Sequence, residues 1–260
     1  MNPTSAVCIV TGAAVGVGAS CAVQLAKRGT RVVINYSKSE QEALQTQTEC
    51  HAVGGEAIVV QGDVAQDADC KRIVQAALDK WGRIDGLINN AGITKFVDQR
   101  DLDGIDADDF QRIYAVNVVG PYQMTRAATP ALQKQGGSVV MISSMSGITG
   151  VGSSNAYVAS KGALNTMTLA LARALAPNVR VNAVCPGLIE TRWHTARFDN
   201  QGDYEKFVEN YEKNVALGKA SSAEDVADVA VWLIESGGMI TGEMIKVDGG
   251  AHLGPAWRKR

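Results

Sequence analysis

The sequence contains few of the residues that build disulfide frameworks and metal sites. Among its 260 residues are five cysteines and three histidines. The cysteines are odd in number and lack pair spacing, which favours a reducing compartment and thiols that pack as small core hydrophobes. The histidines lie far apart, at positions 51, 194 and 252, and form no metal-ligand cluster. We therefore expect reduced cysteines and no bound metal.

Strong net charge and long hydrophobic runs are also missing. The formal net charge is -2, and the basic residues are scattered, so neither nucleic acid nor a membrane surface is indicated as a partner. The first five residues have no positive region and no long apolar run, which disfavours a secretory signal or a transmembrane segment. The remaining composition, 46% apolar and 20% charged, is ordinary for a globular protein. We expect a cytoplasmic protein.

What the sequence does contain is a regular alternation of strand-like and helix-like segments. Short apolar, β-rich runs occupy residues 6–10, 31–36, 57–60, 87–88, 138–142, 179–184 and 244–247. No Pro/Ser-rich linker or low-complexity tract separates them. This pattern predicts a single α/β domain over residues 1–260, a Rossmann-like doubly wound parallel sheet of about seven strands with helices on both faces. Ligands of such sheets bind at the carboxyl ends of the strands.

A glycine-rich turn, residues 11–18, follows the first expected strand and precedes a helix that runs to about residue 28. Gly12, Gly16 and Gly18 would let the backbone approach a pyrophosphate, which the free N–H groups and dipole of the helix face. Glycines also serve tight turns, but the flanking strand and helix supply the context that this motif requires. We expect the whole turn, with Val15 and Val17, to bind a dinucleotide.

The end of the second strand bears on the choice of cofactor. In NAD enzymes an acidic residue there bonds the 2′-hydroxyl of the ribose, and we expect that position to be Tyr36. Ser37 and Lys38 follow, with no carboxylate before Glu40, and could hold a 2′-phosphate. Lys38 could also be an ordinary solvated charge. The segment favours NADP, with NAD as the alternative.

Tyr157 and Lys161 are four residues apart on a predicted helix, which places both side chains on one face. A positive charge about 4 Å from the phenol is worth roughly 4 kcal/mol at an effective dielectric of 20. That charge could lower the pKa of Tyr157 from about 10 by roughly three units, to where a general acid/base works best. Such pairs are common on exposed helices, so the pair alone does not identify a site.

Taken in order, the motifs of the chain resemble the short-chain dehydrogenase/reductase family in its shorter subclass, and within it the 3-oxoacyl-thioester and ketone reductases. The resemblance spans essentially the whole chain. Its motifs are Thr11-Gly12-x-x-x-Gly16-x-Gly18, Asp63-Val64, Asn89-Asn90-Ala91-Gly92, Asn117, Ser144, Tyr157-x-x-x-Lys161, Pro186-Gly187 with Thr191, and Asp248-Gly249-Gly250. The four-residue spacing of the Tyr–Lys pair disfavours the enoyl-reductase branch of the family.

The resemblance implies hydride transfer between NADP(H) or NAD(H) and a carbonyl or secondary alcohol. Tyr157 would be the acid/base, and Lys161 would lower its pKa and bind the nicotinamide ribose. Ser144 would hydrogen-bond the substrate oxygen, unless Ser143 takes that place. Asn117 would hold a water for proton relay, or could instead be a helix-distorting residue satisfied within the core.

The same resemblance implies the remaining cofactor contacts. Asp63, beside Val64, would meet the adenine edge, although it could simply cap the next turn. Asn90, Ala91 and Gly92 would line the adenosine side. Residues after Pro186-Gly187, namely Ile189 and Thr191, would lie at the carboxamide and phosphate. Many NADP-dependent relatives carry a basic residue where this chain has Val15, which weakens the NADP prediction.

A substrate lid is expected around residues 188–217, with Trp193 as a candidate for the substrate wall or, alternatively, a surface residue. The resemblance also implies a homotetramer, built on contacts between the helices of Asn117 and Tyr157, that acts on a small-molecule substrate. A second class of function is a dinucleotide-sensing regulator or scaffold without turnover. The presence of Tyr157, Lys161 and Ser144 argues against it. The sequence leaves the substrate open.

Overall fold

The computed structural model describes residues 6–195, 198 and 200–254. Its centre is one parallel sheet of seven strands in the order β3-β2-β1-β4-β5-β6-β7. The strands are β1 Val7–Val10, β2 Arg31–Tyr36, β3 Ala57–Gln61, β4 Gly86–Asn89, β5 Ser138–Ile142, β6 Arg180–Pro186 and β7 Met244–Val247. The predicted doubly wound fold and its seven strands are confirmed.

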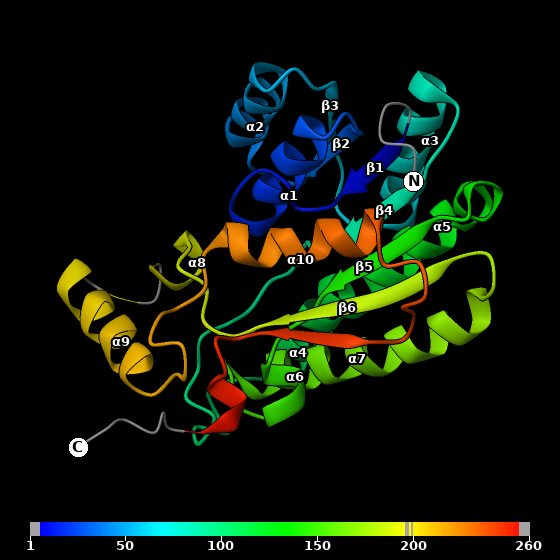
Figure 1. Ribbon diagram of the computed structural model, residues 1–260. Helices are drawn as coiled ribbons and strands as arrows, with labels where there is room; N and C mark the ends of the chain where they lie inside the picture. The colour runs from blue at the N-terminus through cyan, green and yellow to red at the C-terminus, as the bar shows by residue number, and fades with distance from the viewer. Residues whose placement is uncertain (1–5, 196–197, 199, 255–260) are drawn as a thin grey trace.

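Helices cover both faces of the sheet (Figure 1). On one face lie α1 Gly16–Lys27, α2 Glu40–Ala52 and α10 Ala223–Glu235. On the other lie α3 Asp67–Trp81, α5 Gly120–Gln135 and α7 Asn155–Leu175. Shorter elements are α4 Ala107–Tyr114, α6 Ser146–Thr149, α8 Arg192–Thr195, α9 Gln201–Lys213 and the 3₁₀ turn η3 Ala251–Leu253.

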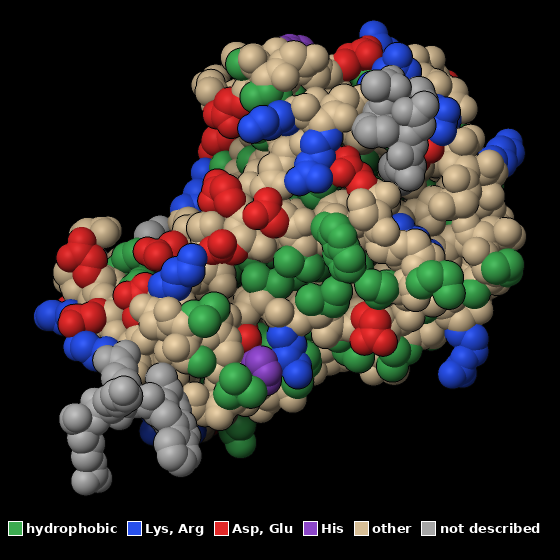
Figure 2. Space-filling view, in the orientation of Figure 1, with side chains coloured by type: hydrophobic (Ala, Val, Ile, Leu, Met, Phe, Trp, Pro, Cys, Tyr) green, Lys and Arg blue, Asp and Glu red, His purple; other side chains and the backbone are tan. Residues whose placement is uncertain are grey.

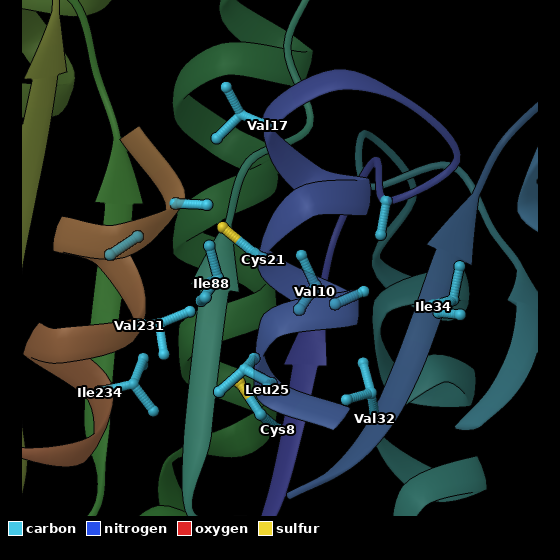
Figure 3. Packing of buried hydrophobic residues seen from close by; sticks show 14 of the residues in the cluster. Cys8, Val10, Val17, Cys21, Leu25, Val32, Ile34, Ile88, Val231 and Ile234 are labelled. Atoms are coloured by element: carbon cyan, nitrogen blue, oxygen red, sulfur yellow. The ribbon is translucent and has the colours of Figure 1, made fainter. Parts of the chain in front are cut away.

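The two core layers follow from the strand sequences. Parallel strands covered on both faces are buried on both faces, so their sequences are continuous apolar runs rather than alternating ones. Figure 3 shows Cys21 and Leu25 of α1 and Val231 of α10 packed over the strand residues Val10 and Ile88. All five cysteines are buried and free, which confirms that they serve as core side chains.

The helical segment that carries Asn117 consists of three consecutive pieces: α4, a π-helical turn η2 at Ala115–Val119, and α5. Pro121 explains part of the break, because it has no N–H to offer the carbonyl of Asn117 four residues earlier. The polar segment from residue 94 to 106 is irregular, and α4 begins after it, where Asp106 and Asp109 form a capping box.

The strand order reverses between β1 and β4, so the connections leave the sheet in opposite directions from its centre. The carboxyl ends of these strands therefore flank a crevice, as in other doubly wound sheets. Within the described residues, no helix is long and apolar enough to cross a membrane. On the face shown in Figure 2, acidic and basic side chains are interspersed rather than segregated by sign.

Candidate active site

A cavity of about 1500 Å³ runs along the carboxyl edge of the sheet. Single-ligand pockets usually measure about 300 to 1000 Å³, so this cavity has room for two ligands side by side. Its walls come from the segments that follow all seven strands and from helices α4, α7, α8 and α9. Of the predicted cofactor residues, Gly12, Val15, Gly16, Val17, Ser37, Lys38, Asp63, Val64, Asn90, Ala91, Gly92, Pro186, Gly187, Ile189 and Thr191 line it.

The glycine-rich turn has the backbone that its sequence demands. Gly12 and Gly16 have φ of 60° and 59°, and a Cβ on Gly12 would lie 2.8 Å from the Cα of Ala91. Val15 provides no side-chain cap for α1, so the first N–H groups of that helix are available to an anion. Gly18 is not a lining residue; a Cβ there would lie 2.5 Å from the amide nitrogen of Asn90. These features fit a pyrophosphate.

Asn90 shapes this turn from inside the protein. Its Nδ2 donates to the carbonyl oxygens of Thr11 and Gly12, at 3.0 and 2.9 Å. Both amide donors of Asn90 are therefore used by the backbone. Asn90 also lines the cavity, and its contact with the adenosine side of a cofactor stays a prediction. Asp63 does cap the next turn, because its Oδ1 accepts from the N–H of Ala65 at 3.0 Å. It is nevertheless exposed and lines the cavity.

The structure corrects the predicted contact between Tyr36 and the cofactor. Tyr36 does not line the cavity; the residue is 6% exposed within the core cluster of α1 and α2, and burial, with the neighbouring Glu40, raises the pKa of its phenol. The reason is strand alternation: Tyr36 shares the face of Ile34, whereas Asn35 and Ser37 point the other way. Ser37 is exposed at the rim of the cavity and takes the position that had been assigned to Tyr36.

Asn35 itself was missed as a functional residue. It is buried and lines the cavity; its Oδ1 accepts from the N–H of Gly12 at 3.3 Å, and its Nδ2 donates to the carbonyl of Gly62 at 3.0 Å. One amide therefore ties the glycine turn to the ends of β2 and β3. The sequence could have indicated Asn35, because neighbouring residues of a strand point to opposite faces and Asn35 therefore lies on the face opposite to Tyr36.

Ser144 and Tyr157 meet on the cavity wall. Ser154 caps α7 by accepting from the N–H of Tyr157 at 3.3 Å, which sets the first turn of that helix. Ser144 and Tyr157 both line the cavity, and Ser144 lies close enough to the phenol to lower its pKa against the effect of burial. Ser144 Oγ accepts from the N–H of Ser146 at 3.1 Å. Ser143, the alternative, instead donates to Asn165 Oδ1 at 2.6 Å in the core.

Lys161 lies one turn further along α7. Its Nζ is 5.6 Å from the centroid of the Tyr157 ring and donates to the carbonyl of Ile142 at 2.9 Å. The side chain is 4% exposed, and this burial lowers the pKa of Lys161 to about 8, although the Cys185 thiol acts in the opposite direction.

The pKa of Tyr157 does not move as predicted. Burial raises the pKa of Tyr157 to about 12, and the neighbouring Ser144 opposes this rise only in part. The lysine was expected to lower it, but its ammonium lies over the ring and loses hydration itself. In the ligand-free protein the phenol is therefore protonated at neutral pH.

The side chain of Asn117 is satisfied within the core, in a distorted turn of its helix, while the predicted role of Asn117 in holding a water stays a prediction. The residue is fully buried in η2, where Nδ2 donates to the Ile93 carbonyl at 2.9 Å and to Ser160 Oγ at 3.1 Å. Its Oδ1 accepts from the N–H of Ile93 at 2.9 Å, so the side chain is satisfied and does not line the cavity. Any water that Asn117 holds would have to bind its main-chain carbonyl, whose α-helical partner position is Pro121.

The segment after β6 folds back over the cavity. A Cβ on Gly16 would lie 3.6 Å from Thr191 Cγ2, so this segment meets the glycine turn. Trp193 stands beside the catalytic candidate Tyr157, with ring centroids 6.1 Å apart. Arg192, which sequence reasoning did not single out, pairs with Glu42 of α2 at 2.9 Å. Residues 196, 197 and 199 of the expected lid lie outside the described residues.

Comparison with known proteins agrees with this geometry. A family model described as "Enoyl-(Acyl carrier protein) reductase" matches residues 12–252. The "Granaticin polyketide synthase putative ketoacyl reductase 2" of Streptomyces violaceoruber is 38% identical over 96% of this chain and 98% of that protein. The "L-rhamnose 1-dehydrogenase (NAD(P)(+))" of Sphingomonas sp. (strain SKA58) is 34% identical over 94% of this chain and 95% of its own length.

A solved structure is similar over the same extent. It is the crystal structure of a "putative short-chain dehydrogenase/reductase" from Burkholderia xenovorans. The two chains are 37% identical, with a TM-score of 0.90 that covers 96% of this chain and 99% of that one. At this identity and coverage the likeness extends to the whole described fold.

Proposed function

The chain belongs to the short-chain dehydrogenase/reductase family and is an NAD(P)-dependent oxidoreductase of alcohol and carbonyl groups, and we propose that its substrate is a ketone with an apolar body, reduced with NADP(H). The observation that carries this proposal is that Ser144, Tyr157 and Lys161 line one cavity, with Lys161 Nζ 5.6 Å from the centroid of the Tyr157 ring and Ser144 close enough to lower the pKa of the phenol.

The protein residues divide the chemistry of reduction among them. The dinucleotide, when bound, supplies the hydride. Tyr157, protonated at neutral pH, gives its proton to the carbonyl oxygen, while Ser144 donates a hydrogen bond to the charge that develops there. Lys161 lies close enough to stabilise the tyrosinate that is left and, with a pKa of about 8, can return a proton to it. Because burial raises the pKa of Tyr157 to about 12, the phenol carries the proton that the reduction needs.

The lining beyond Tyr157 supports an apolar substrate body. Several of its side chains are aromatic or aliphatic, namely Phe96, Val116, Met145, Val151, Leu188, Trp193 and Phe207, although polar side chains such as Arg112, Ser146, Thr149, Ser153 and Tyr211 also line the cavity. A sugar would present several hydroxyl groups, each of which needs a polar partner when buried. The apolar part of the wall therefore favours a substrate of the kind named for the ketoacyl reductase relative over a sugar such as the one named for the rhamnose dehydrogenase relative.

The preference for NADP(H) is proposed from the end of β2. No carboxylate stands at the exposed position Ser37, so a 2′-phosphate would not be repelled, and Lys38 adds a positive charge. An exposed lysine–phosphate contact is worth only about 1 kcal/mol, or less than tenfold in affinity. Since Val15 supplies no basic side chain, we expect a modest preference.

A homotetramer is part of the proposal. Val119, Tyr122 and Leu169 leave 45%, 45% and 46% of their surface exposed, although large apolar side chains are usually buried. They lie at the end of η2, on α5 and on α7, the helices that the resemblance places in subunit contacts. In the same proposal residues 188–217 act as the substrate lid, packed through Tyr204, Val208 and Leu188.

The test is a substrate panel with NADPH and with NADH. It contains acetoacetyl-coenzyme A, 1-decalone, L-rhamnose in the oxidative direction, and crotonyl-coenzyme A for the enoyl reduction named by the family model. We expect turnover of the two ketones and little of the others. Tyr157→Phe should keep cofactor binding and lose about 10²- to 10⁴-fold in kcat. Tight cofactor binding with no turnover of any compound would instead support the dinucleotide-sensing alternative.

A further inference from the structure

The cavity extends past Tyr157 to residues that the reaction does not use. Asp248 and His252, which follow β7, line its far end. We propose that His252, held by Asp248, is a specificity-determining residue that binds a second oxygen group of the substrate, remote from the reacting carbonyl. This inference rests on the proposed ketone reduction.

Asp248 is built to orient the imidazole. Its side chain is 3% exposed, and its Oδ1 accepts from the N–H of Gly250 at 3.0 Å. Its Oδ2 accepts from the N–H of His252 at 2.9 Å and faces Nδ1 of the same residue at 2.8 Å. Burial raises the pKa of Asp248, but these hydrogen bonds outweigh it and hold that pKa below its usual value. The carboxylate is therefore ionised at neutral pH.

The ionised carboxylate decides which imidazole nitrogen is open. A carboxylate can only accept, so Nδ1 of His252 must carry the proton. Nε2 is then the free position, an acceptor in the neutral ring and a donor in the charged one. The side chain of His252 is 30% exposed and lines the cavity, which places the ring within reach of a ligand there. A carboxylate that binds one ring nitrogen in this way fixes the orientation of the imidazole and leaves the other nitrogen for a ligand.

The sheet order places His252 at the substrate end rather than the cofactor end. β2, whose end carries Ser37 and Lys38, is second from one edge, and β7 is the opposite edge. Ser144 follows β5, between the two, so the cavity passes the catalytic pair before it reaches His252. Figure 1 shows η3 directly after the carboxyl end of β7.

The lid and the tail close this end together. Tyr211 of α9 accepts from the N–H of Leu188 at 3.2 Å and donates to the main-chain carbonyl of Asp248 at 3.4 Å. The Asp248–His252 pair is thereby fixed against the element that covers the substrate. A ligand packed on the aromatic wall would meet His252 as a polar group at its distal end.

Two variants separate the proposed ligand-binding role of His252 from a purely structural role. The amide nitrogen of Asn can replace Nδ1, so His252→Asn keeps the bond to Asp248 and removes Nε2. The longer amide of Gln can reach toward the position of Nε2, so His252→Gln restores a polar group there while it weakens the Asp248 bond. If the residue only caps the chain, the Asn variant should match the wild type.

The assay compares ketones in matched pairs: cyclohexanone with 1,4-cyclohexanedione, and 1-decalone with 1,5-decalindione. For the member of each pair that carries the second oxygen, we expect His252→Asn to raise KM about two- to tenfold and leave kcat nearly unchanged. The plain ketone should show the same KM in both proteins. His252→Gln should recover part of the loss.

Each remaining outcome contradicts the inference. If wild type reduces the ketones and His252→Asn shifts no pair, the distal site is refuted while the proposed function stands. An equal rise in KM for both members of a pair would show a general distortion rather than recognition. If wild type reduces no ketone at all, the proposed function fails, and the distal site fails with it.

Discussion

The buried ammonium of Lys161 should make the stability of this protein depend on pH in a defined way. Burial lowers the pKa of Lys161 from 10.5 to about 8 in the folded, ligand-free protein. Below pH 8 the lysine is charged in both states, and the folded state bears the full cost of burying the charge. Between pH 8 and 10.5 the unfolded chain binds more protons than the folded one, so the free energy of unfolding rises with pH.

Lys161→Met removes this dependence and so isolates it. At about 1.4 kcal/mol per pKa unit, the whole effect is about 3 kcal/mol, of which about 2 kcal/mol should appear between pH 7.5 and 9.5. The stability of wild type relative to the variant should therefore increase by that amount over this range. The offset between the two at pH 7.5 also contains the lost bond to the Ile142 carbonyl, so the slope is the diagnostic quantity.

Equilibrium urea unfolding of the cofactor-free proteins at pH 7.5, 8.5 and 9.5 measures this slope. Lys134→Met, which removes an exposed lysine of α5, is the matched control and should run parallel to wild type. If the difference between wild type and Lys161→Met stays flat across the range, Lys161 is not held in a desolvated environment. The proposed return of a proton to Tyr157 near pH 8 would then lose its basis.

Three further predictions concern the cofactor and the assembly. Ser37→Asp should invert the preference for NADPH over NADH, because the new carboxylate repels the 2′-phosphate. The ratio of kcat/KM with the two cofactors measures this preference. An unchanged ratio would show that Ser37 does not face the 2′-phosphate. Gly12→Ala should destabilise the protein and weaken dinucleotide binding by more than Gly54→Ala does. Both glycines have positive φ, but only at Gly12 would the new methyl meet backbone, at 2.8 Å, so thermal unfolding and cofactor titration of the two variants separate the contact from the strain. Light scattering of the wild type at working concentration should give a tetrameric mass, and Tyr122→Lys should lower it; a monomeric wild type would contradict the proposed contact through α5 and α7.

Several features of the site could be read from local sequence because their causes are local. The spacing of Gly12 and Gly16 between a strand and a helix determines a turn with positive φ, whatever packs around it. The four-residue spacing of Tyr157 and Lys161 brings them together on any helix. The succession of continuous apolar runs and helix-like segments likewise predicted the parallel sheet, because strands covered on both faces must be apolar throughout.

Other features depended on which face of an element is covered. The motif at the end of β2 indicated a cofactor contact, but the helices on one face of the sheet took Tyr36 into the core and left Ser37 at the cavity. Asn90 and Asn117 carry side chains that could serve a ligand or the backbone. In the structure both side chains bind the backbone: Asn90 bonds Thr11 and Asn117 bonds Ile93, which are far away in sequence.

The sequence by itself determined the order of the elements, the glycine turn and the pairing of Tyr157 with Lys161 on one face of a helix, since each follows from spacing along the chain. Only the tertiary structure decided the direction of the pKa of Tyr157, because desolvation is set by everything packed around the phenol. It alone also brought the tail residue His252 into the cavity of Ser144, through a sheet whose last strand lies beside β6. Long-range packing of this kind leaves no periodic signal in the sequence.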